Sequence, residues 1–366
     1  MKRKAPRKQE TNGKRQRAEG EPLESGSTWE TREVLVTERS QGGSSAFLLG
    51  HTSNAEFMTK YKPLYMLGKG GFASVYAGKR RADNLPVAIK RIPKLDVSMR
   101  SVTVNGTRHK IPLEVLLMQK AGGEPELVGR ATAVSILDWY DLEQHIVLVM
   151  ERPVPCTDLL EFIDVNGPLE EDEAKVIMRQ LVDASIQMHS AGVFHRDIKS
   201  ENVLIEKCSD APRVRIIDFG CACILNKRNK CFRSFSGTSA YVPPEFYVRG
   251  TYRAGPTTVW QLAALLYEML DGYLHFTTKG FLCNEFNISS DLSQDCQDFL
   301  NMCLALKLKD RATLEQMQQH PWLRSTDSLP VTPPQDPGTS CQHPTDHVST
   351  VDNRVPVVVV THYDSL

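Results

Sequence analysis

The sequence predicts an α+β protein flanked by two tails, because three features divide the chain. Short β-prone segments separated by turn residues fill the first half of a central unit, residues 61–323. Helical apolar patterns fill its second half. Both ends outside this unit are polar. With 41% hydrophobic and 24% charged residues, the composition is that of an ordinary globular protein. We therefore expect a strand-rich lobe followed by a helical lobe.

The strand-rich lobe is expected to contain one helix among its strands. Turn residues separate the β-prone segments, and several segments alternate apolar and polar positions. The predicted strands are residues 64–67, 74–77, 86–92, 131–139 and 145–150, and the predicted helix is residues 111–119.

The helical lobe follows from apolar residues at helical spacing. Residues 171–190 place apolar side chains at i, i+3 and i+4, from Ala174 through Ile177 to Leu181. Residues 258–270 are apolar enough for a buried helix. Residues 295–304 and 313–320 are further predicted helices.

Both tails are expected to be disordered. Residues 1–56 begin with a strongly basic stretch and continue rich in Ser and Gly, and residues 324–366 are rich in Pro, Ser and Thr. Such segments bury too little apolar surface to offset their chain entropy. The basic clusters between Lys2 and Arg17 fit a bipartite nuclear import signal that an import receptor would bind. A merely solvated basic tail is the alternative, and we expect a protein of cytoplasm and nucleus.

Composition excludes several other classes. No apolar run approaches the roughly 20 residues of a membrane helix, so no membrane partner is expected. The nine cysteines are scattered, which indicates reduced thiols rather than a disulfide framework. Net charge is zero, and the first twenty residues hold no aromatic side chain to stack on bases, so no nucleic-acid binding is expected.

A glycine-rich stretch followed by a strand lysine is the first sign of chemistry. Glycines let backbone N–H groups approach phosphates, although a tight hairpin is the alternative for such a stretch alone. Lys90 ends the run Val-Ala-Ile-Lys one strand later. A lysine with apolar neighbours needs an anionic partner, and Glu114 on the predicted helix is the candidate. The stretch is Gly68, Lys69, Gly70, Gly71, Phe72, Ala73, Ser74 and Val75.

The strongest signal is a pair of motifs in the second half. Residues 195–202 read His-Arg-Asp-Ile-Lys-Ser-Glu-Asn, which matches the pattern of a phosphoryl-transfer catalytic loop at each defined position. An Asp-Phe-Gly tripeptide begins at Asp218, after an apolar strand. The ordered set leaves little room for chance.

These motifs, in this order, resemble those of eukaryotic protein kinases over residues 61–323. Within that superfamily the chain resembles the Pim serine/threonine kinases, because residues 151–155 read Glu-Arg-Pro-Val-Pro after a predicted strand. The resemblance implies a bilobal fold, with a five-stranded antiparallel sheet and one helix in the N-terminal lobe, about residues 61–150. A hinge at about 151–155 would precede a mainly α-helical C-terminal lobe, about 156–323.

The resemblance also implies roles for the motif residues, with ATP as substrate and Mg²⁺ as cofactor. Lys90, positioned by Glu114, would hold the α- and β-phosphates, and Asn202 and Asp218 would hold Mg²⁺ through oxygen. Asp197 would accept the proton of the substrate hydroxyl. Lys199 would face the γ-phosphate, and Thr238 would contact Asp197.

An apolar sandwich for adenine follows from the same resemblance, with plain core packing as the alternative. At the hinge, the Glu151 carbonyl would accept from adenine, whereas Pro153 has no N–H to donate. We expect the missing hydrogen bond to cost roughly 1 kcal/mol of nucleotide affinity. The apolar positions are Leu67, Val75, Ala88, Met150, Leu204 and Ile217.

Three carboxylates suggest the substrate class. Asp158, Glu161 and Glu201 match positions where Pim kinases bind arginines, so protein substrates with basic residues before the phosphorylated site are expected. A solvated helix face is the alternative for each. Constitutive activity in a monomer, with roles in cell survival and apoptosis regulation, is what the resemblance implies.

Several positions depart from the pattern. Ala73 replaces the third loop glycine, Thr258 replaces an Asp that braces the catalytic loop in most kinases, and Gln261 replaces the usual Ser. Residues 273–287 depart most, so a short helix is expected there. Ala73, Gln261 and the segment 273–287 keep a second hypothesis open, namely a pseudokinase or scaffold that binds nucleotide or partners without efficient phosphotransfer; the Asp replaced by Thr258 is also missing in the Pim kinases that the chain resembles.

Overall fold

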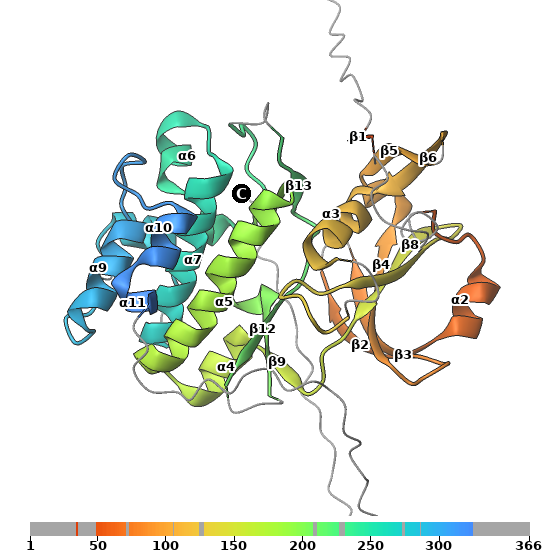
Figure 1. Ribbon diagram of the computed structural model, residues 1–366, viewed down its shortest axis with the longest axis horizontal. Helices are drawn as coiled ribbons and strands as arrows, with labels where there is room; N and C mark the ends of the chain where they lie inside the picture. Colours follow the sequence, from red (N-terminus) through yellow and green to blue (C-terminus); the bar gives the residue numbers. More distant parts are fainter. Residues whose placement is uncertain are drawn as a thin grey trace, which may run out of the picture.

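The chain folds into a strand-rich N-terminal lobe and a helical C-terminal lobe. In Figure 1 the long strands and helix α3 lie on one side of the molecule, and helices α4 to α11 lie on the other. This arrangement is the predicted α+β fold. The computed structural model describes residues 34–35, 49–70, 73–104, 106–123, 128–207, 211–226, 231–272, 275–285 and 287–324.

The N-terminal lobe is built on a five-stranded antiparallel sheet in the order β2-β3-β4-β8-β7. Its central strand, β4, buries Val87 and Ile89 on one face and places Lys90 on the other, because successive side chains alternate. The alternation fixes which face Lys90 serves. The strands are β2 (Tyr61–Lys69), β3 (Ser74–Arg80), β4 (Pro86–Pro93), β7 (Ile136–Asp141) and β8 (His145–Glu151).

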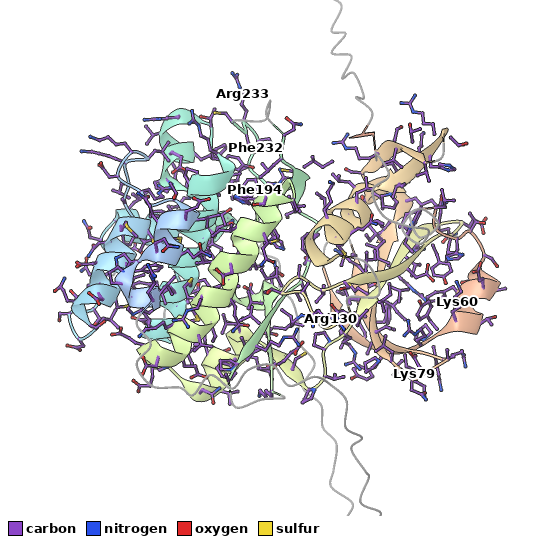
Figure 2. All side chains as sticks on the ribbon, in the orientation of Figure 1. Lys60, Lys79, Arg130, Phe194, Phe232 and Arg233 are labelled. Atoms are coloured by element: carbon purple, nitrogen blue, oxygen red, sulfur yellow. The ribbon has the colours of Figure 1, made fainter. Side chains whose placement is uncertain are left out.

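A short helix covers the outer face of this sheet. The predicted tail extended to residue 56, but helix α2 (Asn54–Lys60) begins two residues earlier, with Ser53 as its N-cap. Phe57 is completely buried against Tyr61 and Tyr140 in a core separate from the main one. Figure 2 shows Lys60, on the same helix, next to the sheet. The prediction was wrong at this boundary because tertiary contacts order the helix.

A β-hairpin precedes helix α3, and the sequence prediction missed it. Strands β5 (Met99–Val104) and β6 (Thr107–Pro112) pair antiparallel, and β1 (Val34–Leu35) adds to β5 in parallel. The predicted helix from residue 111 therefore begins at α3 (Leu113–Gly122). The first two residues of the predicted helix are the last two of β6, since Pro112 occupies the N-cap.

Two long helices form the centre of the C-terminal lobe. Helices α5 (Glu171–Ser190) and α7 (Ala254–Asp271) pack side by side, and the middle of α7 is buried on all sides (Figure 1). A helix apolar all round belongs in a core. Glu245 and Arg311 form a buried ion pair in this lobe, at 2.9 Å. Among the described residues of the segment 273–287, the helix is the five-residue α8 (Thr278–Leu282), as short as expected.

Within the described residues, no helix is long and apolar enough to cross a membrane.

Short elements complete the C-terminal lobe and carry the candidate active site. The remaining elements are β9 (Cys156–Asp158), α4 (Leu159–Asn166), β10 (Val193–Phe194), η3 (Ser200–Asn202), β11 (Val203–Glu206), β12 (Arg213–Ile216), β13 (Cys223–Ile224), η4 (Ser239–Tyr241), α6 (Pro244–Arg249), α9 (Gln294–Cys303), α10 (Leu314–Gln319) and α11 (Pro321–Arg324), with η1 (Lys94–Asp96) in the N-terminal lobe.

Candidate active site

A buried lysine joins the two lobes at the centre of the site. Lys90 Nζ lies 2.8 Å from Glu114 Oε1 on α3 and 2.8 Å from Asp218 Oδ1 in the C-terminal lobe. Burial alone would lower the pKa of Lys90, but the charges of Glu114 and Asp218 outweigh it and raise this pKa. The ammonium group is therefore charged at neutral pH, as the sequence predicted from its apolar neighbours.

Asp218 has a free side available to a cation. The positive charge of Lys90 holds the pKa of Asp218 well below its usual range, so the carboxylate is ionised. Its backbone has a φ of 60°, in the left-handed region, and its side chain is half exposed. The described hydrogen bonds, from Lys90 and from the backbone N–H of Gly220, both use Oδ1. Oδ2 is therefore left to coordinate a metal ion.

Asp197 is held by two neighbouring segments. Its Oδ1 accepts hydrogen bonds from the N–H and the hydroxyl of Thr238, each at 2.7 Å. The Asn202 amide nitrogen donates to the backbone oxygen of Asp197 at 2.9 Å and to Oδ2 at 3.2 Å. This arrangement leaves the Asn202 amide oxygen for a cation. The predicted pairing of Thr238 with the catalytic aspartate is present.

The donor set fits Mg²⁺ bound together with a nucleotide. Asn202 and Asp218 supply oxygen atoms, which hard cations prefer. Among the described residues, no three His, Cys, Asp or Glu side chains cluster as a protein-only metal site would require. A cation on this pair would therefore take its other ligands from phosphate and water.

Lys199 lies close to the catalytic carboxylate but has a partner of its own. Its buried ammonium lies 3.1 Å from Glu201 Oε1. Burial opposes its charge, yet Asp197 and Glu201 together raise the pKa of Lys199. Glu201, predicted to face basic substrates, is thus already shared with Lys199.

The other two predicted substrate carboxylates lie at the start of α4. Asp158 caps this helix, and its Oδ1 accepts the N–H of Glu161 at 2.8 Å. Glu161 Oε2 accepts the Thr157 hydroxyl at 2.6 Å. Burial, with added repulsion from the charges of Glu161 and Glu201, raises the pKa of Asp158. The structure therefore brings the three carboxylates close enough to interact.

A fourth carboxylate near them was missed in the sequence. Glu268 lies near the C-terminal end of the buried stretch of α7, and it accepts hydrogen bonds from Tyr241 Oη at 2.6 Å and from Ser200 Oγ at 3.2 Å. The available signal was a carboxylate within a largely apolar run. Glu268 links α7 directly to the catalytic segment.

The predicted nucleotide side is assembled from both lobes. Ala88 and Met150 are cross-strand partners in β4 and β8, and Val75 pairs with Lys90. Leu204 lies on β11 beside Asp158 of β9, and Ile217 directly follows β12. Leu67, Val75, Ala88, Leu204 and Ile217 are only partly buried, unlike core positions of the same strands.

The described residues of the glycine-rich stretch lie at the end of β2 and the beginning of β3. Gly68 and Lys69 end β2, and the N–H of Gly70 donates to the carbonyl of Ala73 at 2.9 Å. Ser74 and Val75 begin β3. Gly71 and Phe72, which were also predicted to face phosphate, lie outside the described residues.

The hinge shows a feature that the sequence did not predict. The side chain of Glu151 is buried, accepts the N–H of Ser135 at 2.6 Å, and pairs with Arg215 of β12. Arg215 also pairs with Glu206 at 2.8 Å. The predicted adenine contact of the Glu151 carbonyl stays a prediction, as does the lost donor at Pro153, whose carbonyl accepts from Cys156 Sγ at 3.0 Å.

Comparison with known proteins agrees with this geometry. The family model for the protein kinase domain matches residues 61–323. Serine/threonine-protein kinase pim-2 of Danio rerio is 35% identical over 73% of this chain and 86% of that protein. Serine/threonine-protein kinase prk-2 of Caenorhabditis elegans is 32% identical over 74% of this chain, and 59% of that protein is covered.

A more distant relative is the PAS domain-containing serine/threonine-protein kinase of Mus musculus, which is 31% identical over 75% of this chain but only 19% of that protein. The chain belongs to the protein kinase family. Among the three relatives named here, pim-2 of Danio rerio has the highest identity.

Proposed function

We propose that this chain is an ATP- and Mg²⁺-dependent serine/threonine protein kinase. The observation that carries the proposal is the Lys90 ammonium group, 2.8 Å from both Glu114 and Asp218. Such a fixed cation beside an ionised, half-exposed carboxylate suits the binding of a nucleotide triphosphate with its metal. The names of the relatives support a serine or threonine hydroxyl as the acceptor.

Each charged group has a distinct part in the reaction. Asp197 accepts the proton of the substrate hydroxyl while the new bond from that oxygen to the γ-phosphorus forms and the bond from phosphorus to ADP breaks. Lys90 holds the α- and β-phosphates, and Lys199 offsets charge on the transferred group. Mg²⁺ held by Asn202 and Asp218 would neutralise charge on the phosphate oxygens. Thr238 keeps Asp197 in place.

Basic protein substrates are the finer part of the proposal. Asp158, Glu161 and Glu201 make a negative cluster beside the catalytic loop, and burial together with the charges of Glu161 and Glu201 raises the pKa of Asp158. An arginine before the phosphorylated residue would relieve that repulsion. The partial use of Glu201 by Lys199 predicts a preference weaker than three free carboxylates would give.

Activity without loop phosphorylation is also part of the proposal. Arg196 follows His195 in the catalytic loop, where an arginine is a natural partner for a phosphorylated activation segment. Here its guanidinium donates to the backbone oxygens of Cys221 and Ala222. The chain's own carbonyls therefore already engage part of the group that a phosphate would attract.

The test is phosphate transfer from labelled ATP and Mg²⁺ to a serine peptide with arginines before the serine. We expect transfer by the wild type, at least a 100-fold loss for Lys90→Met and for Asp197→Asn, and weaker transfer to a peptide without arginine. Lys79→Met is a matched control, because Lys79 lies on the neighbouring strand β3 and away from the site (Figure 2). Its ammonium group donates a hydrogen bond of 3.0 Å to Asn84.

Three results would contradict the proposal. A folded wild type that binds ATP but transfers no phosphate would favour the pseudokinase. Equal activity of Asp197→Asn and wild type would remove Asp197 from the reaction. Equal rates for the two peptides would remove the basic substrate class while leaving kinase activity intact.

A further inference from the structure

We propose that Gln261 is a positioning residue that holds the catalytic loop of this kinase in its active shape. The inference rests on the proposed kinase function. Gln261 lies in α7, is completely buried, and donates from Nε2 to the backbone oxygen of Arg196 at 2.6 Å. Arg196 directly precedes Asp197, so this hydrogen bond acts one residue away from the reacting carboxylate.

The backbone at Arg196 needs such a support. Its φ of 70° lies in the left-handed region, which residues with a side chain rarely adopt without compensating contacts. The turn directs the Asp197 carboxylate toward Thr238. A hydrogen bond to the carbonyl of Arg196 fixes the peptide plane that follows this φ, and therefore fixes the direction in which Asp197 leaves the loop.

The same carbonyl also meets the end of the activation segment. Gly237 packs so closely that a Cβ there would lie 2.4 Å from the oxygen of Arg196. The next residue, Thr238, holds Asp197 Oδ1. Gln261 of α7 thus binds the same carbonyl oxygen of Arg196 that Gly237 packs against. Helix α7, the catalytic loop and the end of the activation segment position Asp197 together.

The chemistry of the side chain argues against mere packing. Within the described residues, Gln261 Oε1 is buried with no hydrogen-bond partner. A methionine or leucine would fill similar space without an unpaired buried oxygen. The reverse amide orientation would set two oxygens against each other, so the network assigns Nε2 to Arg196. The donor is therefore the useful part of this residue.

The neighbouring polar residue on α7 does not perform this task. Thr258, one turn before Gln261, has its hydroxyl 3.1 Å from His189 Nε2 on α5. The hydroxyl therefore connects two helices of the lobe rather than the catalytic loop. Since α7 is itself fixed by Trp260, which donates to Thr278 at 2.8 Å, Gln261 offers a rigid point of attachment.

The test compares Gln261→Met, which removes the donor but keeps the length, with Thr258→Val, which removes a hydroxyl from the same helix. We expect Gln261→Met to lower kcat about tenfold while the KM for ATP stays unchanged, because Lys90 and Asp218 lie outside this contact. Thr258→Val should keep the wild-type kcat. Wild-type kcat in Gln261→Met would overturn the inference.

Gln261→Glu gives a second readout, which a purely structural role would not produce. The ionised carboxylate repels the oxygen of Arg196, but the protonated acid can donate to it. Activity relative to wild type should therefore recover between pH 8 and pH 6 or stay high throughout. A ratio fixed at the Gln261→Met level at every pH would overturn the inference.

The pH comparison requires that the titration of the other groups around α7 affects wild type and variant equally. They are Arg196 and Asp197 in the loop, His195 beside them, His189 on α5 and Glu268 farther along α7. Burial lowers the pKa of His189 to about 4 and raises that of Glu268 to about 7. Both residues remain in wild type and variant, so the ratio of activities reports on position 261.

Failure of the kinase proposal would be recognisable separately. If wild type transfers no phosphate, the kinase proposal fails. The contact of Gln261 with Arg196, the brace, is then tested by hydrogen exchange at the backbone amides of residues 195–202. Faster exchange in Gln261→Met than in Thr258→Val supports the brace, and equal exchange overturns it.

Discussion

Glu268 is a residue whose protonation is strongly altered by its surroundings. It is buried within α7 and accepts hydrogen bonds from Tyr241, Ser200 and the N–H of Phe276. Burial raises its pKa from 4.5 to about 7, and the charge of Glu201 adds to the effect. The folded protein therefore holds a proton on this carboxyl over a pH range in which the unfolded chain has released it.

The proton on Glu268 predicts a dependence of stability on pH. Its stabilising contribution is complete below about pH 4.5 and is lost as the pH rises through about 7. We expect the free energy of unfolding of wild type, relative to Glu268→Gln, to fall by about 2–3 kcal/mol between pH 5 and pH 8. Urea unfolding at several pH values measures it. Parallel curves for the two proteins would contradict the expected pKa.

At this scale the motif residues could be predicted because their order along the chain is distinctive. Lys90 pairs with Glu114, and Asp197 accepts a hydrogen bond from Thr238, as the sequence predicted. Glu268 and the contact of Gln261 could not be predicted. Their roles depend on which face of α7 meets the catalytic loop, and an all-buried helix has no polar face to reveal it.

Among the elements, β11 and β12 carry a chain of charges that reaches the hinge. Arg215 of β12 lies between Glu206 of β11 and Glu151 at the end of β8, with 1% of its side chain exposed. Arg213 pairs with the same Glu206 at 3.3 Å, but 39% of its side chain is exposed. The two arginines therefore form a matched pair with different burial.

Removal of the buried arginine should cost far more than removal of the exposed one. Arg215→Met leaves the buried Glu151 carboxylate without the cation of its ion pair, while Glu206 keeps Arg213, and we expect the variant to destabilise the fold by about 3–5 kcal/mol. Arg213→Met should cost about 1 kcal/mol or less. Chemical denaturation compares them. Equal losses would show that burial does not set the strength of this network.

The elements show where sequence patterns run out. The long helices and most strands lie close to their predicted positions, but the strand predicted at 131–139 begins only at Ile136 as β7. The β5–β6 hairpin was missed although the sequence between the two strands reads Asn-Gly, a strong hairpin signal. The apolar residues before Leu113 were assigned to the helix. Strand and helix periodicity cannot be separated in so short a run, and only pairing with β5 decides it.

The whole molecule depends on residues that precede its family match. Helix α2 closes a second core, in which Phe57 packs on Tyr61 and Tyr140. His51 extends this contact through Glu56 at 2.8 Å and Asp138 at 3.1 Å. The tail boundary predicted from composition at residue 56 was wrong, because α2 is a seven-residue helix whose one fully buried side chain, Phe57, packs on a strand some eighty positions later in the chain.

We expect Phe57→Ala to destabilise the protein by about 3–5 kcal/mol, and a chain that begins at residue 61 to lose at least as much. Met58→Ala is the control, since Met58 is largely exposed on the same helix and should change stability by about 0.5 kcal/mol or less. Urea unfolding of the three proteins checks this. Equal stability of the shortened and full chains would remove α2 from the fold.

The buried contact of Glu151 with Arg215 has a mechanical consequence. Beside it, Thr132 and Val134 exchange backbone hydrogen bonds with Ile216 of β12. The N-terminal lobe is therefore attached to the C-terminal lobe on the hinge side. We expect any rotation between the lobes to turn about this contact. Lys90 and Asp218 meet across the lobes away from it, so small rotations should change the distance between these two groups, where phosphate is proposed to bind.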